Sequence, residues 1–274
     1  MKNQSVREFC RAWAAGILAT LLATFWAVTP AAGADVQMVR ASDKLIEITG
    51  KGWRLKYGDV SREKDYRYLA EPSLAIAGDH AFFSHGAWLR MIDTKKGIVV
   101  GRWHFPGDIV GLVPEGKQIQ VKVRLGDERN LSTRQIKFDP DAPDLPYWPT
   151  GSLILSRMPL QEANWPGIPF ANFDSKVPTQ LARETIPEFV EAIRRDPLSP
   201  MFQACLGRLL LDTGDPGASA IFRQALQVPT TDFTELLPLS AFFDAAGERE
   251  LARVAFERGY RDFWEKGNDP RLLT

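Results

Sequence analysis

The stretch MIDTKKGIVVGRWHFPGDIVGLVPEGKQIQVKV, residues 91 to 123, alternates short apolar segments with turns that contain glycine. Three dipeptides separate its candidate strands: Lys96-Gly97, Pro106-Gly107 and Glu115-Gly116. In its last strand every second residue is apolar, at Ile119, Val121 and Val123. This alternation is typical of a half-buried strand in an antiparallel sheet. The stretch therefore predicts an antiparallel β region.

Similar segments occur throughout residues 35–138. Each is a short alternating or apolar run bounded by turn residues. The candidate strands are Val36 to Val39, Leu45 to Ile48, Trp53 to Tyr57, Leu74 to Ile76, Ala81 to Ser84, Trp88 to Ile92, Ile98 to His104, Ile109 to Val113, Gln118 to Leu125 and Ser132 to Phe138. We therefore expect one β domain over residues 35–138.

The turn chemistry of residues 72–123 resembles that of YVTN-type β-propeller blades. The matching positions are Ile92-Asp93-Thr94, Gly97, Val99-Val100, Gly111 and Pro114-Glu115-Gly116-Lys117. Gly78 and Gly116 lie 38 residues apart, as expected of blade-sized units. Propellers use at least about four blades, whereas residues 35–138 hold about two and a half units of this length. The resemblance therefore implies an antiparallel region of blade-like units and no closed propeller.

The C-terminal part of the chain has a repeat of about 34 residues. Phe189, Phe222 and Phe256 recur at spacings of 33 and 34. A small residue follows each of them three positions later: Ala192, Ala225 and Gly259. Gly214 and Gly247 lie 33 residues apart at predicted turns. A period near 34 predicts stacked helical hairpins, with the aromatic ring filling the gap between successive hairpins.

These positions resemble the tetratricopeptide repeat over residues 178–264. One unit matches with Leu206-Gly207, Gly214, Ala218, Phe222 and Ala225, and the next with Leu239, Phe243, Gly247, Ala252, Phe256 and Gly259. Ser240 replaces the usual glycine, and the first unit shows only its second helix. The family fold implies a concave groove lined by the first helix of each pair, where a peptide partner binds.

On that mapping the groove-lining residues are Met201, Ala204, Arg208, Leu211, Thr234, Leu237, Ala241 and Asp244. Arg208 and Asp244 are the polar candidates for anchoring a peptide, and Arg208 is expected to be exposed. The alternative is an array that packs on the β region and binds nothing.

Between these parts, residues 139–177 form a predicted connector. Asp139 to Pro178 contains eight prolines, too many for a helix or a strand, so it should run extended over the surface. The expected class is α+β, with a blade-like antiparallel β domain at 35–138 and tetratricopeptide-like helical repeats at 178–274.

The N-terminus has the layout of a secretory signal peptide over residues 1–34. Lys2, Arg7 and Arg11 precede an uncharged run at 12–28, and Ala32-Gly33-Ala34 follows. The chain is therefore expected to be periplasmic or secreted, with no membrane attachment after cleavage. If it is not cleaved, residues 12–28 would anchor the protein on the extracytoplasmic side, because an apolar run of this length is near the lower limit for spanning a bilayer.

Charge and cysteine content exclude several classes of protein. The chain has 34 basic and 34 acidic residues, so it lacks the positive charge that nucleic acid binding requires. Its two cysteines are Cys10, in the predicted signal peptide, and Cys205. A mature chain with a single cysteine forms no internal disulfide, and its stability must come from buried apolar surface.

The chain has three histidines, His80, His85 and His104. His80 and His85 are five residues apart, which places them on opposite faces of a continuous strand. They complete no recognisable ligand set, so no cofactor or metal is predicted. The alternative is a small-molecule, cofactor or metal-binding relative of propeller enzymes that uses these histidines.

No common catalytic motif occurs in the sequence: it has no G-x-S-x-G, no H-E-x-x-H and no phosphate-binding glycine loop. Glu184, Glu188 and Glu191 form one exposed face of a predicted helix, near Arg194 and Arg195 for pairing. We therefore predict a non-catalytic adaptor or scaffold for a protein or peptide partner in the cell envelope. A further alternative is the N-terminal part of a longer envelope protein, because Asn268-Asp269-Pro270 is typical of a helix start.

Overall fold

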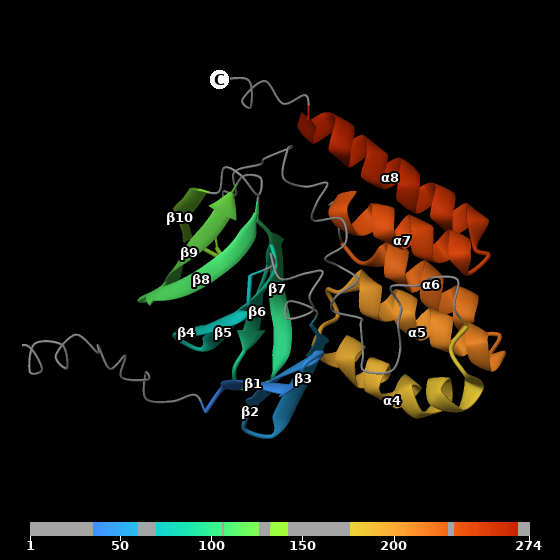
Figure 1. Cartoon of the computed structure of the whole chain (residues 1–274), viewed down its shortest axis with the longest axis horizontal. Coiled ribbons are helices and arrows are strands. Elements are labelled where there is room, and N and C mark those ends of the chain that lie inside the picture. Colours follow the sequence, from blue (N-terminus) through green and yellow to red (C-terminus); the bar gives the residue numbers. More distant parts are fainter. Residues whose placement is uncertain are drawn as a thin grey trace, which may run out of the picture. The chain divides into compact units, whose positions relative to one another are not determined.

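The computed structural model describes residues 35–59, 70–105, 107–125, 132–141, 176–229 and 233–267 (Figure 1). These residues belong to one compact unit, Gly33–Thr274. Within them, ten strands precede five helices, which confirms the α+β class. The predicted signal peptide, residues 142–175 of the predicted connector and the predicted helix start at 268–270 lie outside the described residues. So do the side chains of Phe233, Thr234 and residues 262–267.

The β region consists of three antiparallel sheets, each formed by strands that follow one another in the chain. The first sheet contains β1 (Gln37–Ser42), β2 (Leu45–Gly50) and β3 (Trp53–Gly58). The second contains β4 (Ser73–Ala77), β5 (His80–His85), β6 (Trp88–Asp93) and β7 (Ile98–His104). The third contains β8 (Asp108–Glu115), β9 (Gln118–Leu125) and β10 (Ser132–Phe138). All ten predicted strands are present, and none of the described sheets closes into a barrel.

The second sheet is buried on both faces. Phe82 and Leu89 point to an apolar core shared with Ile119 and Val121 of the third sheet. Phe83 and Ile92 point the other way, into a core shared with the first sheet and the helices. Because both faces are covered, β5 is buried along almost its whole length in place of strict alternation.

The five helices are α4 (Thr179–Arg195), α5 (Pro200–Thr213), α6 (Ala218–Gln227), α7 (Phe233–Ala245) and α8 (Arg249–Gly267). Helices α5 and α6 form one hairpin, α7 and α8 form the next, and α4 packs on α5 (Figure 1). In the described residues, no helix combines the length and apolar character needed to cross a membrane.

The two hairpins have equivalent turns. Gly214 and Gly247 adopt left-handed conformations with φ of 78° and 82°, which glycine tolerates without a steric cost. In both turns the next N–H bonds to a carbonyl five residues back, from Asp215 to Leu210 and from Glu248 to Phe243. The predicted turns are therefore present at the predicted spacing, while membership of the tetratricopeptide family stays a prediction.

Two of the three repeated phenylalanines fill the predicted gaps. Phe189 and Phe222 are fully buried and make edge-to-face contacts with Phe202 and Phe243, at 6.1 and 5.6 Å between ring centroids. Phe256, by contrast, is 51% exposed, so the prediction that it fills such a gap is wrong.

The reason is the position of α8 in the helical series. Ala252 and Gly259 are buried like their counterparts Ala218 and Ala225, so α8 has the same helical phase as α6. Phe222 is packed against Phe243 of the following hairpin, whereas no described helix follows α8 to cover Phe256.

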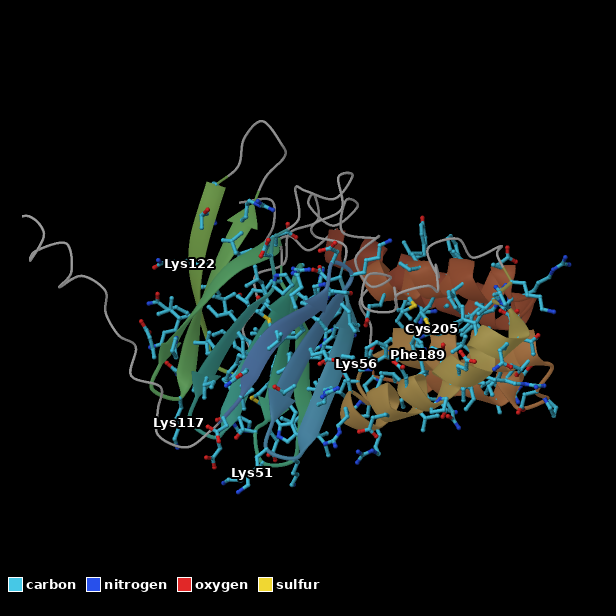
Figure 2. All side chains as sticks on the ribbon, turned by 60° about the horizontal axis from the view of Figure 1, so that its bottom comes forward. Lys51, Lys56, Lys117, Lys122, Phe189 and Cys205 are labelled. Atoms are coloured by element: carbon cyan, nitrogen blue, oxygen red, sulfur yellow. The ribbon has the colours of Figure 1, made fainter. Side chains whose placement is uncertain are left out.

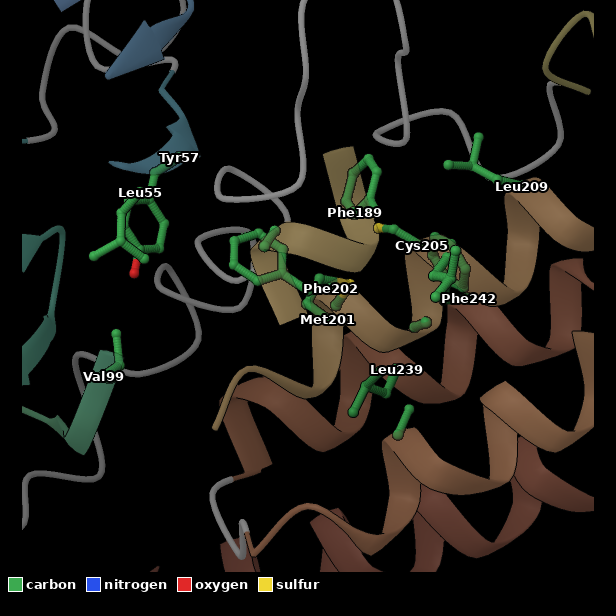
Figure 3. Packing of buried hydrophobic residues seen from close by; sticks show 14 of the residues in the cluster. Leu55, Tyr57, Val99, Phe189, Met201, Phe202, Cys205, Leu209, Leu239 and Phe242 are labelled. Carbon is green, nitrogen blue, oxygen red and sulfur yellow. The ribbon is translucent and has the colours of Figure 1, made fainter. Parts of the chain in front are cut away.

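The β and helical regions share a hydrophobic core. Tyr57 of β3 stacks on Phe202 of α5 at 5.8 Å between ring centroids. Figure 3 shows Leu55 and Val99 of the sheets on the same side of this core as Tyr57, with Met201 on the helical side. The helices are therefore packed directly on the sheets.

Candidate functional site

An open cleft lies between the β2–β3 hairpin and helix α4, with a volume of ≈ 620 Å³. Residues 49–50 and 52–56 of the hairpin form one wall. The other wall is a stripe along α4: Pro187, Glu188, Glu191, Ala192 and Arg195. The volume is within the range of ligand sites, and both walls combine apolar and charged side chains.

Strand β3 forms the hairpin wall and is an edge strand. Among the described strands it pairs with β2 alone, and its other edge borders the cleft. Its side chains alternate: Trp53 and Leu55 are buried, whereas Arg54 is exposed and Lys56 half-buried. The Trp53 indole donates a hydrogen bond to the carbonyl of Thr94 at 2.8 Å, which ties the hairpin to the second sheet. The strand edge is therefore held in place by its own side chains.

An ion pair joins the two walls of the cleft. Lys56 Nζ lies 3.2 Å from Glu188 Oε2, although the two residues are 132 positions apart. Arg54 is 60% exposed and lies 3.6 Å from Glu47. It therefore adds an accessible positive charge to the hairpin wall.

The carboxylate of Glu191 on α4 stays ionised. Hydrogen bonds from Arg194 and then Arg195 lower the pKa of Glu191 to about 2, against the opposing effect of partial burial. Arg195 also donates to the carbonyl of Lys96 at 2.6 Å, which ties the end of α4 to the β6–β7 turn. The predicted pairing of Glu191 with Arg194 and Arg195 is thus confirmed.

Buried charges hold α4 against the sheets. Arg90 and Arg102 are direct neighbours on adjacent strands, β6 and β7, of the second sheet. Arg90 Nε donates to Asp196 Oδ2 at 3.0 Å, and the Tyr57 hydroxyl donates to the same oxygen at 3.0 Å. Arg102 forms an ion pair with Glu235 of α7. The two carboxylates compensate two like charges that would otherwise repel each other in the interior.

Asp196 also ends α4, since its N–H bonds to the carbonyl of Ala192. The backbone of Asp196 thus caps α4, while its buried carboxylate sets how the end of the helix sits on β3 and β6. This arrangement positions the helical wall of the cleft.

Several residues predicted to line a concave groove are buried. Met201 and Ala204 are fully inaccessible, and Arg208 is only 7% exposed. Arg208 Nε donates to Asp212 Oδ2 at 3.1 Å, and that oxygen also accepts the N–H of Val177 at 2.9 Å. The expectation that Arg208 is an exposed charge is therefore wrong. It helps to hold the start of α4 on α5.

The other predicted groove residues differ in exposure. Leu211 is 40% exposed, Ala241 and Asp244 are exposed, and Leu237 is half-buried. The side chain of Thr234 lies outside the described residues. That these residues bind a partner stays a prediction.

The three histidines do not come together. His85 is buried, and its Nε2 lies 3.3 Å from Asp59 Oδ1. The ring of His104 packs against that of Trp88 at 4.8 Å between centroids, tilted by 43°. Trp88 of β6 pairs with His85 of β5 on one side and with His104 of β7 on the other, so it lies between the two histidines. His80 begins β5, at the other end of the strand from His85. Across the described part of the chain, no three histidine, cysteine or acidic side chains are grouped as metal ligands.

Cys205 is the one cysteine among the described residues, and it is fully buried in α5. Burial raises the pKa of its thiol well above the usual value, because the thiolate would be poorly solvated. Figure 2 shows Cys205 among the helices.

Sequence reasoning missed the cleft. It identified the strand Trp53 to Tyr57 and the acidic face of α4, but not that the two lie opposite each other. The one local hint is Pro187 inside α4, which removes a helical N–H at the cleft.

Compared with protein-family models, with characterised proteins and with solved structures, the chain has no significant match. The resemblances to propeller blades and to tetratricopeptide repeats therefore remain predictions from the residues alone.

Proposed function

We propose that this chain is an exported, non-catalytic adaptor that binds an extended peptide segment of a partner protein in the cleft between β3 and α4. The observation that carries this proposal is the edge of β3, which borders an open cleft of ≈ 620 Å³. An extended peptide can add to such an edge through main-chain hydrogen bonds, and pockets for alternate side chains then provide specificity.

The side chains of β3 indicate which peptides fit. Arg54 and Lys56 project to the same side of the strand, and opposite charges on neighbouring strands stabilise pairing. Acidic residues at alternate positions of the peptide therefore fit that side. Apolar residues between them fit the walls near Leu55, Pro187 and Ala192.

The rest of the fold supports this role. Because α4 is attached to the sheets by Asp196 and Arg195, the cleft is preorganised, which lowers the entropic cost of binding. The signal-peptide layout of residues 1–34 favours a partner in the periplasm or cell envelope.

The test is selection of peptides from a displayed random library against the purified protein, followed by affinity measurement. We expect the selected peptides to share alternating acidic and apolar residues. Replacement of Pro187 by tryptophan should fill the cleft and weaken their binding by roughly tenfold or more. This substitution also restores a helical N–H, so α4 should remain folded.

The matched control is Val190→Trp on the same helix. Val190 is 50% exposed and does not line the cleft, so this variant should bind like the wild type. Equal binding of the selected peptides to the wild type and Pro187→Trp would place the binding site elsewhere, and failure to select any peptide would count against peptide binding itself.

A further inference from the structure

The ion pair of Lys56 and Glu188 crosses the cleft. Lys56 belongs to the hairpin wall and Glu188 to the helical wall. Their charged atoms lie 3.2 Å apart, so the two side chains together bridge the space between the walls. A segment that enters the cleft beside β3 therefore meets this bridge.

The bridge differs from the ion pairs that hold the helices on the sheets. The side chains of Lys56 and Glu188 are 30% and 43% exposed, whereas those of Arg90 and Asp196 are fully buried. An exposed pair contributes little, because water solvates both partners when they separate. Breaking a buried pair instead leaves charges in the interior that water does not reach. The bridge can therefore open at little cost while the buried pair stays closed.

The neighbouring carboxylates of α4 have partners on the helix itself. Glu184 accepts a hydrogen bond from Gln180 at 2.6 Å, and Glu191 accepts one from Arg194 at 2.6 Å. Glu188 reaches across to the sheet instead. Of these three carboxylates, it is therefore the one placed to neutralise the hairpin wall.

The backbone of α4 does not need to move for the bridge to open. Phe189, the residue after Glu188, is fully buried and packs on Phe202 of α5. At the end of the helix, Arg195 donates to the carbonyl of Lys96 at 2.6 Å. These contacts hold the helix in place beside the bridge, so only the two charged side chains have to change conformation.

We propose that Glu188 is a built-in competitor of the peptide. In the free protein its carboxylate holds the place beside Lys56 that an acidic side chain of the peptide takes on binding. This inference rests on the proposed function and adds how the cleft selects its ligand. Binding exchanges one carboxylate for another at the same ammonium group, and Glu188 turns toward water. Because like charges repel, Glu188 then disfavours a second acidic side chain next to the first.

The first experiment measures binding of a short, dye-labelled peptide of alternating glutamate and valine by fluorescence anisotropy. Glu188→Gln should tighten binding by about twofold to fivefold, because an exposed ion pair no longer has to be broken. In a Lys56→Gln background the same substitution should give a clearly smaller gain, because it releases no ammonium group. Equal or weaker binding by Glu188→Gln overturns the competitor role.

The matched control is Glu184→Gln, which removes the same charge one turn earlier on α4 and outside the cleft. It should bind the peptide like the wild type, and circular dichroism checks that each variant is folded. An equal gain from Glu184→Gln would mean that net charge controls the affinity, and this result also overturns the inference.

A second experiment shows which carboxylate lies beside Lys56. A carbodiimide joins a lysine amine to a neighbouring carboxylate as an amide, with loss of water, and mass spectrometry identifies the linked residues. Without peptide we expect a link between Lys56 and Glu188. With saturating peptide we expect Lys56 to be linked to a glutamate of the peptide.

The outcomes separate this inference from the proposed function. A Lys56–Glu188 link that persists while anisotropy shows bound peptide overturns the exchange and leaves peptide binding intact. A probe that does not bind to the wild type also overturns the exchange. Whether the proposed function fails as well is then decided by the displayed library, which tests peptide binding without any assumption about charge.

Discussion

The two helical hairpins, α5/α6 and α7/α8, have the same turn but different surroundings. Gly214 and Gly247 have nearly the same backbone conformation and lie 33 residues apart. Yet Phe222 of the first hairpin is fully buried, whereas Phe256 of the second is half exposed. A repeated spacing therefore determines the helices and the turn. Burial of the repeated phenylalanine depends on whether a further hairpin packs on the second helix.

The two hairpins also differ at the equivalent positions Gly207 of α5 and Ser240 of α7, where the first helix of each pair approaches the second. A Cβ on Gly207 would lie 2.6 Å from the ring of Phe222, so only glycine fits there. The corresponding residue, Ser240, instead donates a hydrogen bond to the carbonyl of Ala252 at 2.8 Å. A hydroxyl hydrogen bond therefore replaces the glycine–ring contact in the second hairpin, where the equivalent ring, that of Phe256, is exposed.

The largest expected effect is that of Phe222→Ala. Emptying this buried site should lower the free energy of unfolding by about 3 to 5 kcal/mol. Urea unfolding followed by far-UV circular dichroism measures the change. A loss below about 1 kcal/mol would mean that Phe222 does not fill the gap between the hairpins.

The second-largest loss of unfolding free energy is expected for Gly207→Ala. Its new methyl group overlaps the Phe222 ring, and overpacking of this kind costs about 2 to 3 kcal/mol. The same substitution in a Phe222→Ala background should cost much less, because the two sites are in direct contact. Additive losses in the double variant would contradict this contact.

Gly214→Ala and Gly247→Ala should cost similar amounts, about 1 to 2 kcal/mol each. Nothing lies within 4 Å of the added Cβ at either site, so the cost comes from the left-handed backbone alone. Thermal unfolding of the two variants compares the turns directly. Clearly unequal losses would show that the turns are not equivalent.

The smallest effect is expected for Phe256→Ala. It should change the free energy of unfolding by less than about 0.5 kcal/mol, because about half of the side chain is exposed to water. Chemical unfolding at low protein concentration provides the measurement. A loss as large as that of Phe222→Ala would show that other residues cover the Phe256 ring.

Local pattern was sufficient to predict the secondary structure. Alternation and turn residues predicted all ten strands, and the strands Ile98–His104, Gln118–Leu125 and Ser132–Phe138 end where expected. Both hairpin turns also occur at their glycines. These features depend on residues close in the chain, whose periodicity and backbone preferences can be read directly.

The candidate site was not predictable in the same way. Lys56 and Glu188 are 132 residues apart, and Arg90 and Asp196 are 106 apart. Each has the sequence surroundings of an ordinary surface charge, and only chain packing makes them partners. Arg208 shows the converse, because a residue assigned to an exposed groove is buried against Asp212.

The order of strands and helices, the turns and the absence of a strong net charge follow from local propensity and composition, so the amino-acid pattern alone predicts them. Chain packing determines which residues belong to the site and which to the core: the edge of β3 beside α4, the buried Arg90–Asp196 contact and the exposed ring of Phe256. The physical reason is that a strand edge, a compensated buried charge and an exposed aromatic pair are defined by neighbours distant in the chain.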